Sequence, residues 1–226
     1  MIARRTLLAG AALMGTVGFL PLCARAAEPL PYDAKGDPFE FILKLNNAVL
    51  DRIRADKALR SGDIAALTEL VNSLIMPAVD FQMMTRMTVG PKWRQASDEQ
   101  KQALMDGFEL LLMRVYAGAL AEVSDQTVKL RPSRSRKVQE EMVIRTLMTG
   151  GSGQETGIDY RIYRSKTGQW KIVDVNIEGI WMVENYRSQF ASVLSEGGID
   201  GLIKLFKEKG ESLADQMKST APGAKK

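Results

Sequence analysis

The spacing of hydrophobic residues changes from a helical to a strand period near residue 127. Before that point apolar side chains recur every three or four residues, which places them on one face of a helix. Beyond it they alternate with polar side chains, as in a strand with one buried face. The helical spacing returns over the last part of the chain. This order of helices, strands and helices predicts an α+β domain.

The first predicted helix spans residues 39–59 and begins at Asp37 and Pro38. Asp can accept hydrogen bonds from the free N–H groups of a first helical turn, and Pro suits the first helical position. A second helix is predicted over residues 64–75, which Pro77 should end or kink because it lacks a backbone N–H group.

The fourth predicted helix has the clearest start in the chain and follows a short third helix over residues 79–87. Ser97 and Gln100 have the spacing of a capping box, in which each side chain satisfies a backbone N–H group of the other residue. The apolar surface of this helix is unusually wide for a helix with one side in water. A surface of this width predicts more than one packing partner.

Strands separated by glycine-containing turns are predicted after these helices, in a mostly antiparallel meander. Residues 150–153 and 166–168 supply the glycines that hairpin turns need. The middle strands carry bulky apolar residues on both faces, as at Met142 and Val143, so one face is expected to take helices and the other a cover or a ligand. The four strands are expected at residues 128–130, 142–148, 158–162 and 173–177.

Two helices, over residues 183–195 and 199–217, are predicted to close the fold, with a break at the glycine pair 197–198. About seven helices are therefore expected around a four-stranded sheet. Since no repeat or long linker divides the chain, residues 27–218 should form one domain and residues 219–226 a disordered tail.

Residues 1–26 are predicted to be a cleavable signal peptide. An arginine pair precedes an apolar stretch over residues 6–22, and the small residues Ala24 and Ala26 follow it. Glycines disfavour an uncleaved membrane anchor, and the bulky residue before Cys23 disfavours lipidation. The arginine pair also fits a twin-arginine exporter, so Sec and Tat export both stay open.

Composition removes several classes of function. The chain has no histidine and one cysteine, Cys23, so the mature domain lacks Ser–His and Cys–His nucleophiles, histidine-bound metals and disulfides. Three arginines and no acidic residue lie in the leader, so cleavage lowers the formal charge from +4 to +1. A near-neutral domain lacks the basic excess that supports nucleic-acid binding, and no nucleic acid is expected as a partner.

The remaining chemical candidates fit structural roles. Glu140 and Glu141 are adjacent on a strand and point to opposite faces. Residues 166–168 read Lys-Thr-Gly, but no Ser-x-x-Lys motif supplies a nucleophile. The basic segment 131–137 lacks aromatic residues and is expected to be a solvated connection, with docking to anionic headgroups as the sharper hypothesis. No catalytic residue and no metal site are predicted.

Methionines and aromatic residues are concentrated in the middle of the chain, where core filling explains each one singly. Methionine adapts to irregular or variable partners, so the group as a whole also suits an apolar ligand. Its members are Phe81, Met83, Met84, Met87, Trp93, Met105, Phe108 and Met113.

Several local strings, in this order of elements, carry a family signature. Residues 89–94 read VGPKWR and lead into the capping box. Residues 170–175 read WKIVDV and continue through IEGI at 177–180 to NYRSQF at 185–190, before the glycine-containing segment 198–202. Together these strings resemble the periplasmic phospholipid-binding proteins of the Mla pathway, the MlaC or toluene-tolerance family, over nearly all of the mature chain.

The resemblance implies a curved antiparallel sheet wrapped by helices in an NTF2/cystatin-like cone, with a deep apolar pocket for acyl chains and the headgroup near solvent. It implies a monomeric periplasmic carrier without enzymatic activity or cofactor. Such a carrier shuttles phospholipid between an outer-membrane lipoprotein complex and an inner-membrane ABC transporter with an MCE-domain ring, and so maintains outer-membrane lipid asymmetry and solvent tolerance.

Two positions depart from the family pattern. Residues 88–90 replace a more typical Leu-Gly, and Trp181 stands where a small polar residue is usual. Trp181 is expected to narrow or reshape the mouth of the pocket. From the faces of the predicted elements and the family order, the lipid-binding lining is expected to consist of Phe81, Met84, Trp93, Phe108, Leu112, Tyr116, Ile144, Ile162, Val175 and Ile180.

Two other classes of function use the same features. A small cone-fold enzyme could use Asp159 or Asp174 as an acid or base in the cavity, and a raised pKa there would favour it. A cavity-free periplasmic adaptor could bind a partner through a sheet edge or the basic segment 131–137. Within the carrier hypothesis, hopanoid-like lipids suit an apolar cavity as well as phospholipids do.

Overall fold

The computed structural model describes residues 29–132, 137–150 and 155–218. The predicted signal peptide and C-terminal tail lie outside these residues, as do residues 133–136 of the basic segment and 151–153 of a predicted turn. Within the described ranges, no helix is both long enough and apolar enough to cross a membrane.

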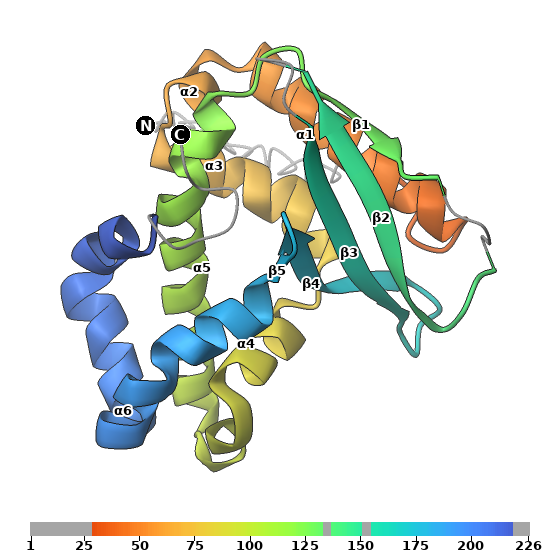
Figure 1. Ribbon diagram of the computed structural model, residues 1–226. Coiled ribbons are helices and arrows are strands. Elements are labelled where there is room, and N and C mark those ends of the chain that lie inside the picture. The colour runs from red at the N-terminus through yellow and green to blue at the C-terminus, as the bar shows by residue number, and fades with distance from the viewer. Residues whose placement is uncertain (1–28, 133–136, 151–154, 219–226) are drawn as a thin grey trace, which may run out of the picture.

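Helices precede and follow an antiparallel sheet, which confirms the α+β class (Figure 1). The helices are α1 (Pro38–Ala55), α2 (Lys57–Arg60), α3 (Ile64–Leu70), α4 (Phe81–Val89), α5 (Asp98–Ala121) and α6 (Met182–Lys218). The π turn η1 (Val71–Ile75) and the 3-10 turns η2 (Met76–Ala78) and η3 (Gly90–Gln95) connect α3, α4 and α5.

The helix predicted over residues 39–59 is two helices, because Asp56 interrupts it. Asp56 has extended backbone angles, and its carboxylate accepts hydrogen bonds from the N–H groups of Ala58 and Leu59 at the start of α2. The cap at Asp37 is confirmed. The capping box of α5 is also confirmed, since the side chain of each of its two residues accepts from the backbone N–H of the other.

The sheet is an antiparallel meander in the order β1-β2-β3-β4-β5. The predicted number of four strands is wrong, because Ile180 and Trp181 form a fifth strand against β4. Glu178 and Gly179 both have positive φ, as a two-residue hairpin turn requires, and a strand of two residues is too short to show a period. The strands are β1 (Thr127–Leu130), β2 (Glu141–Thr149), β3 (Thr156–Arg164), β4 (Trp170–Ile177) and β5 (Ile180–Trp181).

The two helices predicted at the C-terminus are one bent helix, α6. Because the helix predicted over residues 39–59 is two helices, the described residues contain six α-helices, where about seven were expected. Gly198 has a φ of 63°, yet the helical hydrogen bonding continues through it. Figure 1 shows α6 changing direction along its length. The glycine pair therefore bends the chain without ending the helix.

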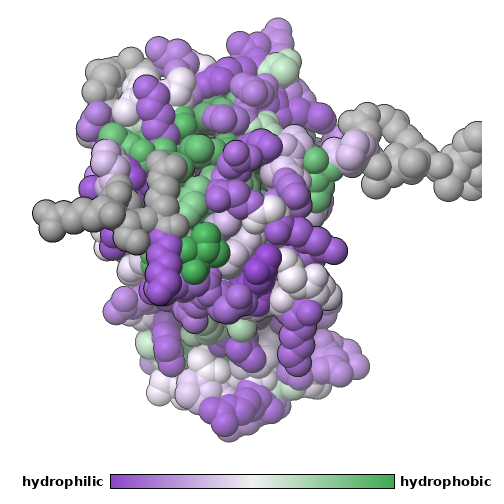
Figure 2. Space-filling model, turned by 90° about the vertical axis from the view of Figure 1, so that its right-hand side faces the viewer, coloured by the Kyte–Doolittle hydropathy of each residue, from purple (hydrophilic) through white to green (hydrophobic). Residues whose placement is uncertain are grey.

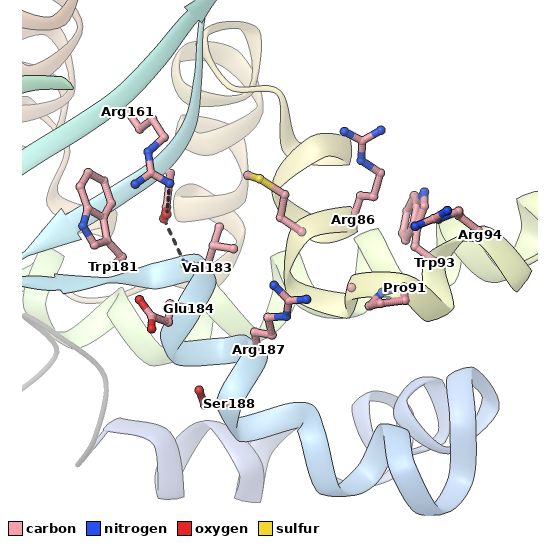
Figure 3. A pocket seen from close by; sticks show the side chains of 13 residues that line it. Arg86, Pro91, Trp93, Arg94, Arg161, Trp181, Val183, Glu184, Arg187 and Ser188 are labelled. Atoms are coloured by element: carbon pink, nitrogen blue, oxygen red, sulfur yellow. Dashed lines mark hydrogen bonds and ion pairs between the residues drawn. The ribbon is translucent and has the colours of Figure 1, made fainter. Parts of the chain in front are cut away.

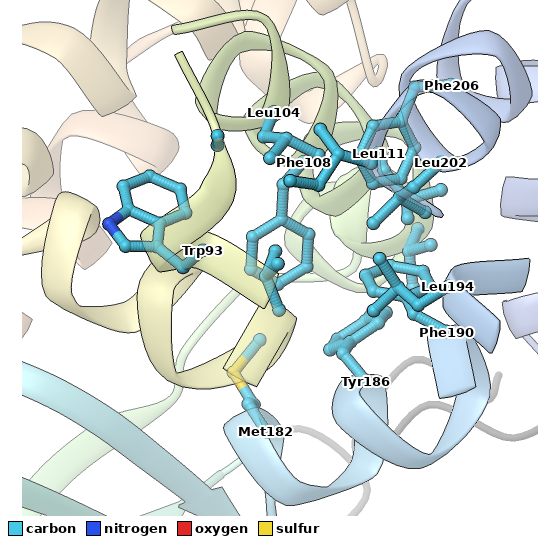
Figure 4. Packing of buried hydrophobic residues seen from close by; sticks show 14 residues of the cluster. Trp93, Leu104, Phe108, Leu111, Met182, Tyr186, Phe190, Leu194, Leu202 and Phe206 are labelled. Atoms are coloured by element: carbon cyan, nitrogen blue, oxygen red, sulfur yellow. The ribbon is translucent and has the colours of Figure 1, made fainter. Parts of the chain in front are cut away.

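Two large apolar clusters occupy the two halves of the molecule. The sheet cluster lies between α1 and one face of the sheet, and it includes Phe41, Ile42, Leu45, Ile144, Tyr160, Ile162, Trp170 and Ile172. The helical cluster lies among α4, α5 and α6, and it includes Trp93, Leu104, Phe108, Leu111, Tyr186, Phe190, Leu202 and Phe206 (Figure 4). Val175 of β4 packs against both clusters, so β4 joins the two halves.

A third, smaller cluster fixes α1, α2 and α3 against α5, through residues that include Ile53, Leu59, Leu67 and Met113. Most members of these clusters are less than a tenth exposed, so the three clusters form the buried core of the molecule. The cone shape and the deep apolar cavity accordingly stay predictions.

Candidate functional site

A pocket of about 880 Å³ opens where β4 and β5 meet the start of α6 and the turn after α4 (Figure 3). Its lining combines charged and apolar side chains. The residues are Arg86, Met87, Gly90, Pro91, Trp93, Arg94, Arg161, Asp174, Trp181, Val183, Glu184, Arg187 and Ser188.

One wall of the pocket is the junction of α4 and η3. Asp80 caps α4 by accepting a hydrogen bond from the N–H of Met83. Gly90 ends the helix with a φ of 73° and a ψ of −146°, a conformation that glycine adopts far more readily than other residues. The resulting sharp turn directs Arg86 and Arg94 to the same pocket from two successive elements.

The opposite wall is the junction of β4, β5 and α6, and Asp174 holds it together. Its carboxylate Oδ1 accepts hydrogen bonds from the N–H groups of Val175 at 2.9 Å and Val183 at 3.1 Å. Its other oxygen lies 3.5 Å from the guanidinium of Arg161. The residue is 1% exposed, and burial raises its pKa above the usual range, although these hydrogen bonds and Arg161 oppose the shift.

Trp181 joins this wall through a cation–π contact. The guanidinium carbon of Arg161 lies 4.4 Å from the centre of the Trp181 ring. Arg161 therefore lies between a carboxylate and an aromatic face, both of which favour a guanidinium in a fixed position. The residue at which the chain departs from the family pattern thus lies on the pocket wall.

The predicted lipid-binding residues are divided between the two halves of the molecule. Trp93, Phe108, Phe81, Leu112 and Tyr116 belong to the helical cluster or pack against it. Ile144 and Ile162 lie in the sheet cluster, and Val175 contacts both clusters. Met84 is buried on α4, whereas Ile180 is 45% exposed.

Trp93 is the predicted lining residue that also lines the described pocket. The other nine are not on its wall, so their role as a lipid-binding lining stays a prediction. The structure does bring Phe81 and Phe108 into a stack with ring centres 5.7 Å apart. Phe108 in turn contacts the rings of Tyr186 and Phe190 (Figure 4).

The arginines of the pocket were missed by reasoning that looked for apolar positions. Arg94 ends the first signature string, and Arg187 lies within the NYRSQF string. Arg86 and Arg161 are isolated in the sequence and no pattern marks them. Their meeting depends on the turn at Gly90 and on the pairing of β4 with β3, where Arg161 stands opposite Asp174.

Of the two carboxylates considered for catalysis, Asp174 lies in the pocket and Asp159 does not. Asp159 faces Arg145 across β2 and β3, with 3.7 Å between Oδ2 and Nε. Burial raises its pKa, although Arg131 and Arg145 pull it down. Since Oδ1 of Asp174 accepts from the Val183 N–H at the start of α6 and Oδ2 pairs with Arg161 of β3, its geometry has a structural explanation.

No group of three or more carboxylate, cysteine or histidine side chains in the described ranges is placed to hold a metal ion.

The face that carries the sheet has hydrophobic side chains gathered in its upper half among hydrophilic ones (Figure 2).

The fold and the pocket define an α+β protein with a ligand-sized pocket where a sheet meets a layer of helices. The chain belongs to the MlaC family, because the family model described as MlaC protein matches residues 44–208.

Two curated relatives match the chain over most of its length. The toluene tolerance protein ttg2D of Pseudomonas putida is 26% identical over 176 residues, which cover 77% of this chain and 81% of the relative. The intermembrane phospholipid transport system binding protein MlaC of Haemophilus influenzae is 23% identical over 172 residues, covering 75% and 80%.

A solved structure, the phospholipid-binding protein of Ralstonia solanacearum in complex with a phospholipid, is similar in fold. The TM-score is 0.72 at 38% sequence identity, and the match covers 80% of this chain and 99% of that one. The two curated relatives and the solved structure each match three quarters or more of this chain.

Proposed function

We propose that this protein is a periplasmic carrier that binds a diacyl phospholipid and shuttles it between membrane complexes. The observation that supports this most strongly is the 38% identical structure from Ralstonia solanacearum, which contains a phospholipid and matches the chain over 99% of its own length. The two curated relatives are named for toluene tolerance and intermembrane phospholipid transport.

The physical argument for a carrier starts from the insolubility of the cargo. A diacyl lipid has about 30 methylenes, and at ~0.8 kcal/mol each their transfer from water is worth roughly 25 kcal/mol. Transfer from a bilayer to an apolar protein interior changes little, because both surroundings are dry. A carrier therefore exchanges lipid during contact with a donor or acceptor and keeps it during diffusion.

We place the acyl chains between the helical cluster and the sheet, next to Phe81, Tyr116 and Val175. These three residues are half-buried, and acyl chains entering here would displace the side chains around them. The hydroxyl groups of Tyr116 and Tyr186 support such movement. They are buried and neither has a partner in good hydrogen-bond geometry among the described residues, although a weak hydrogen bond between the two contributes to the shift in the pKa of each.

An unpartnered buried hydroxyl costs about 1–3 kcal/mol, which makes this region less tightly determined than a fully satisfied core. Burial raises the pKa of Tyr116 to about 12. Both hydroxyl groups therefore stay neutral at physiological pH, as an acyl-chain site requires.

The partners in this proposal are an inner-membrane ABC transporter carrying an MCE-domain ring and an outer-membrane lipoprotein complex. The carrier acts as a monomer, after export and removal of residues 1–26, and residues 27–218 are the lipid-binding domain. Its physiological effect is the maintenance of outer-membrane lipid asymmetry.

Native mass spectrometry of the protein purified without added lipid tests the proposal. The expected result is one diacyl phospholipid per chain in a substantial fraction of molecules. Protein that emerges lipid-free and takes no lipid from phospholipid vesicles would instead favour the cavity-free adaptor.

Ile180→Glu tests whether the exposed apolar end of β5 belongs to the lipid path. Ile180 is 45% exposed, so a charge there leaves the fold intact, and it should lower lipid occupancy. Ile64→Glu is the matched control, because Ile64 is 37% exposed at the start of α3. Equal lipid occupancy in the two variants would remove Ile180 from the path.

A second candidate function is an enzyme that uses Asp174, and the raised pKa of this buried pocket carboxylate favours it. The two hydrogen bonds from Val175 and Val183 favour the structural role. Incubating lipid-loaded protein and following the bound lipid by mass spectrometry separates the two. Conversion of the lipid that Asp174→Asn abolishes would establish the enzyme, whereas an unchanged lipid mass supports the carrier.

A further inference from the structure

The pocket between α4, η3 and α6 carries more positive than negative charge at its open rim. Arg86, Arg94 and Arg187 line it, all three are exposed, and none forms an ion pair with a residue that the structure describes. They come from α4, η3 and α6, so they reach the pocket from three elements rather than from one helix face (Figure 3). Guanidinium groups bind phosphate oxygens through paired, charge-assisted hydrogen bonds.

The carboxylates of the pocket leave this charge largely uncompensated. Asp174 is engaged by Arg161 and by two backbone N–H groups, at the inner end of the pocket. Glu184 is exposed and is the other acidic lining residue in the described part of the chain. Three arginines therefore face one available carboxylate.

Gly90 fixes the position of Arg187 at the rim. A Cβ atom at residue 90 would lie 3.1 Å from Nη2 of Arg187, which is closer than ordinary van der Waals contact. The absent side chain lets the guanidinium lie against the turn between α4 and η3. The Gly90 backbone of one wall and the Arg187 side chain of the other thus lie against each other at the pocket.

The pocket borders the apolar region proposed for the acyl chains. Trp93 lines the pocket and is also a buried member of the helical cluster. Met182, a member of that cluster, is flanked in the chain by the pocket residues Trp181 and Val183. An amphiphile with its tails in the cluster and its polar group in the pocket therefore spans no polar barrier.

We propose that this arginine-lined pocket is a phosphate-binding site that holds the phosphodiester of the lipid headgroup. The inference rests on the proposed carrier function and adds to it a fixed position for the headgroup. Free inorganic phosphate has the same chemistry, so the test distinguishes the two sources.

The test compares Arg187→Gln and the double variant Arg86→Gln, Arg187→Gln with the wild-type protein and with Arg60→Gln. Arg60 is an exposed arginine of α2 outside the pocket, so it controls for loss of one charge. Delipidated protein is loaded from vesicles of phosphatidylethanolamine and phosphatidylglycerol. Parallel vesicles contain diacylglycerol with the same acyl chains, and bound lipid is counted by mass spectrometry.

The expected result is a roughly tenfold loss of phospholipid affinity in Arg187→Gln, the effect of one charge-assisted hydrogen bond, and a larger loss in the double variant. Diacylglycerol loading should be unchanged in both variants. Phospholipid loading equal to that of wild type would overturn the headgroup site and leave the carrier function standing. Equal losses of both lipids would also overturn it, because the arginines would then act on the fold.

A wild-type protein that takes up neither lipid contradicts the carrier function itself. Phosphorus NMR titration with inorganic phosphate then tests whether the pocket binds free phosphate. Line broadening by wild type but not by the double variant supports a phosphate site that takes free phosphate, and the headgroup assignment is overturned. The absence of broadening overturns the site altogether.

Discussion

The sheet cluster and the helical cluster differ in how their buried polar atoms are satisfied. In the sheet cluster the Tyr160 hydroxyl donates to Asn46 at 2.7 Å, Trp170 Nε1 donates to the Gly36 carbonyl at 3.1 Å, and the Tyr32 hydroxyl donates to the Leu74 carbonyl at 2.8 Å. In the helical cluster the hydroxyl groups of Tyr116 and Tyr186 have no such partner among the described residues.

This difference assigns separate tasks to the two halves. A cluster with satisfied polar groups has one preferred arrangement, and it supplies the rigid frame on which β4 and the pocket wall are built. A cluster of aromatic rings whose hydroxyl groups lack well-formed hydrogen bonds breaks fewer hydrogen bonds when it rearranges. The helical half is therefore where a guest can be admitted without unfolding the sheet.

The most disruptive test removes the anchor of the sheet cluster. Trp170 is 1% exposed, and its indole joins β4 to the segment before α1. Trp170→Ala is expected to lower the free energy of unfolding by about 3–5 kcal/mol, because it leaves a large cavity and an unpaired carbonyl. Urea denaturation followed by circular dichroism measures this. A loss below about 1 kcal/mol would mean that the sheet is not the rigid half.

The next test tightens the helical cluster. A Cβ atom at Gly107 would lie 2.5 Å from Phe206 Cδ2 and 2.8 Å from its Cβ, so α5 and α6 approach too closely for a side chain. Gly107→Ala should destabilise the protein by about 1–3 kcal/mol through overpacking. Gly118→Ala on the same helix meets nothing within 4 Å and should be neutral or stabilising. Equal effects of the two changes in urea denaturation would show that the α5–α6 contact is loose.

A matched pair of tyrosine variants compares the hydroxyl groups directly. Tyr160→Phe removes a buried hydrogen bond to Asn46 and should cost about 1–2 kcal/mol of unfolding free energy. Tyr186→Phe removes a hydroxyl whose contact with Tyr116 lacks good hydrogen-bond geometry, so it should cost less unfolding free energy than Tyr160→Phe. The comparison between the clusters fails if Tyr186→Phe is the more costly change.

The smallest expected effect concerns pH. Burial raises the folded-state pKa of Asp174 above its ordinary 3.8, so the folded protein binds this proton more readily than the unfolded chain does. The stabilisation from this proton is therefore fully present below the ordinary pKa of 3.8 and is lost as the pH rises through the raised pKa. Asp174→Asn should remove this part of the pH dependence, as measured by urea denaturation at several acidic pH values. An identical pH profile in the variant would show that the folded-state pKa is not raised.

The sequence predicted those elements whose information is local. The cap at Asp37, the capping box of α5 and the hairpin turn at Gly168 all depend on residues within a few positions, and each is confirmed. The period of two located β1 to β4, but β5 has two residues and no period to detect. The break at Asp56 was missed because an Asp inside a helical pattern is ordinary unless its backbone becomes extended.

Local patterns also indicated the apolar lining candidates, but only tertiary structure decided their neighbours. Phe81 and Phe108 meet because α4 and α5 pack together, whereas Ile144 and Ile162 lie under α1 in the other cluster. The family strings already contained Arg94 and Arg187, yet their convergence with Arg86 depends on the turn at Gly90.

The sequence by itself determined the α+β class, most helix starts and the family, because capping, periodicity and signature strings are short-range properties. The tertiary structure alone decided which arginines share a pocket and which hydroxyls lack partners. These properties depend on contacts between elements distant in the chain, such as α4 and α6. No local pattern encodes such a meeting, since the same residues on a different packing arrangement would lie apart.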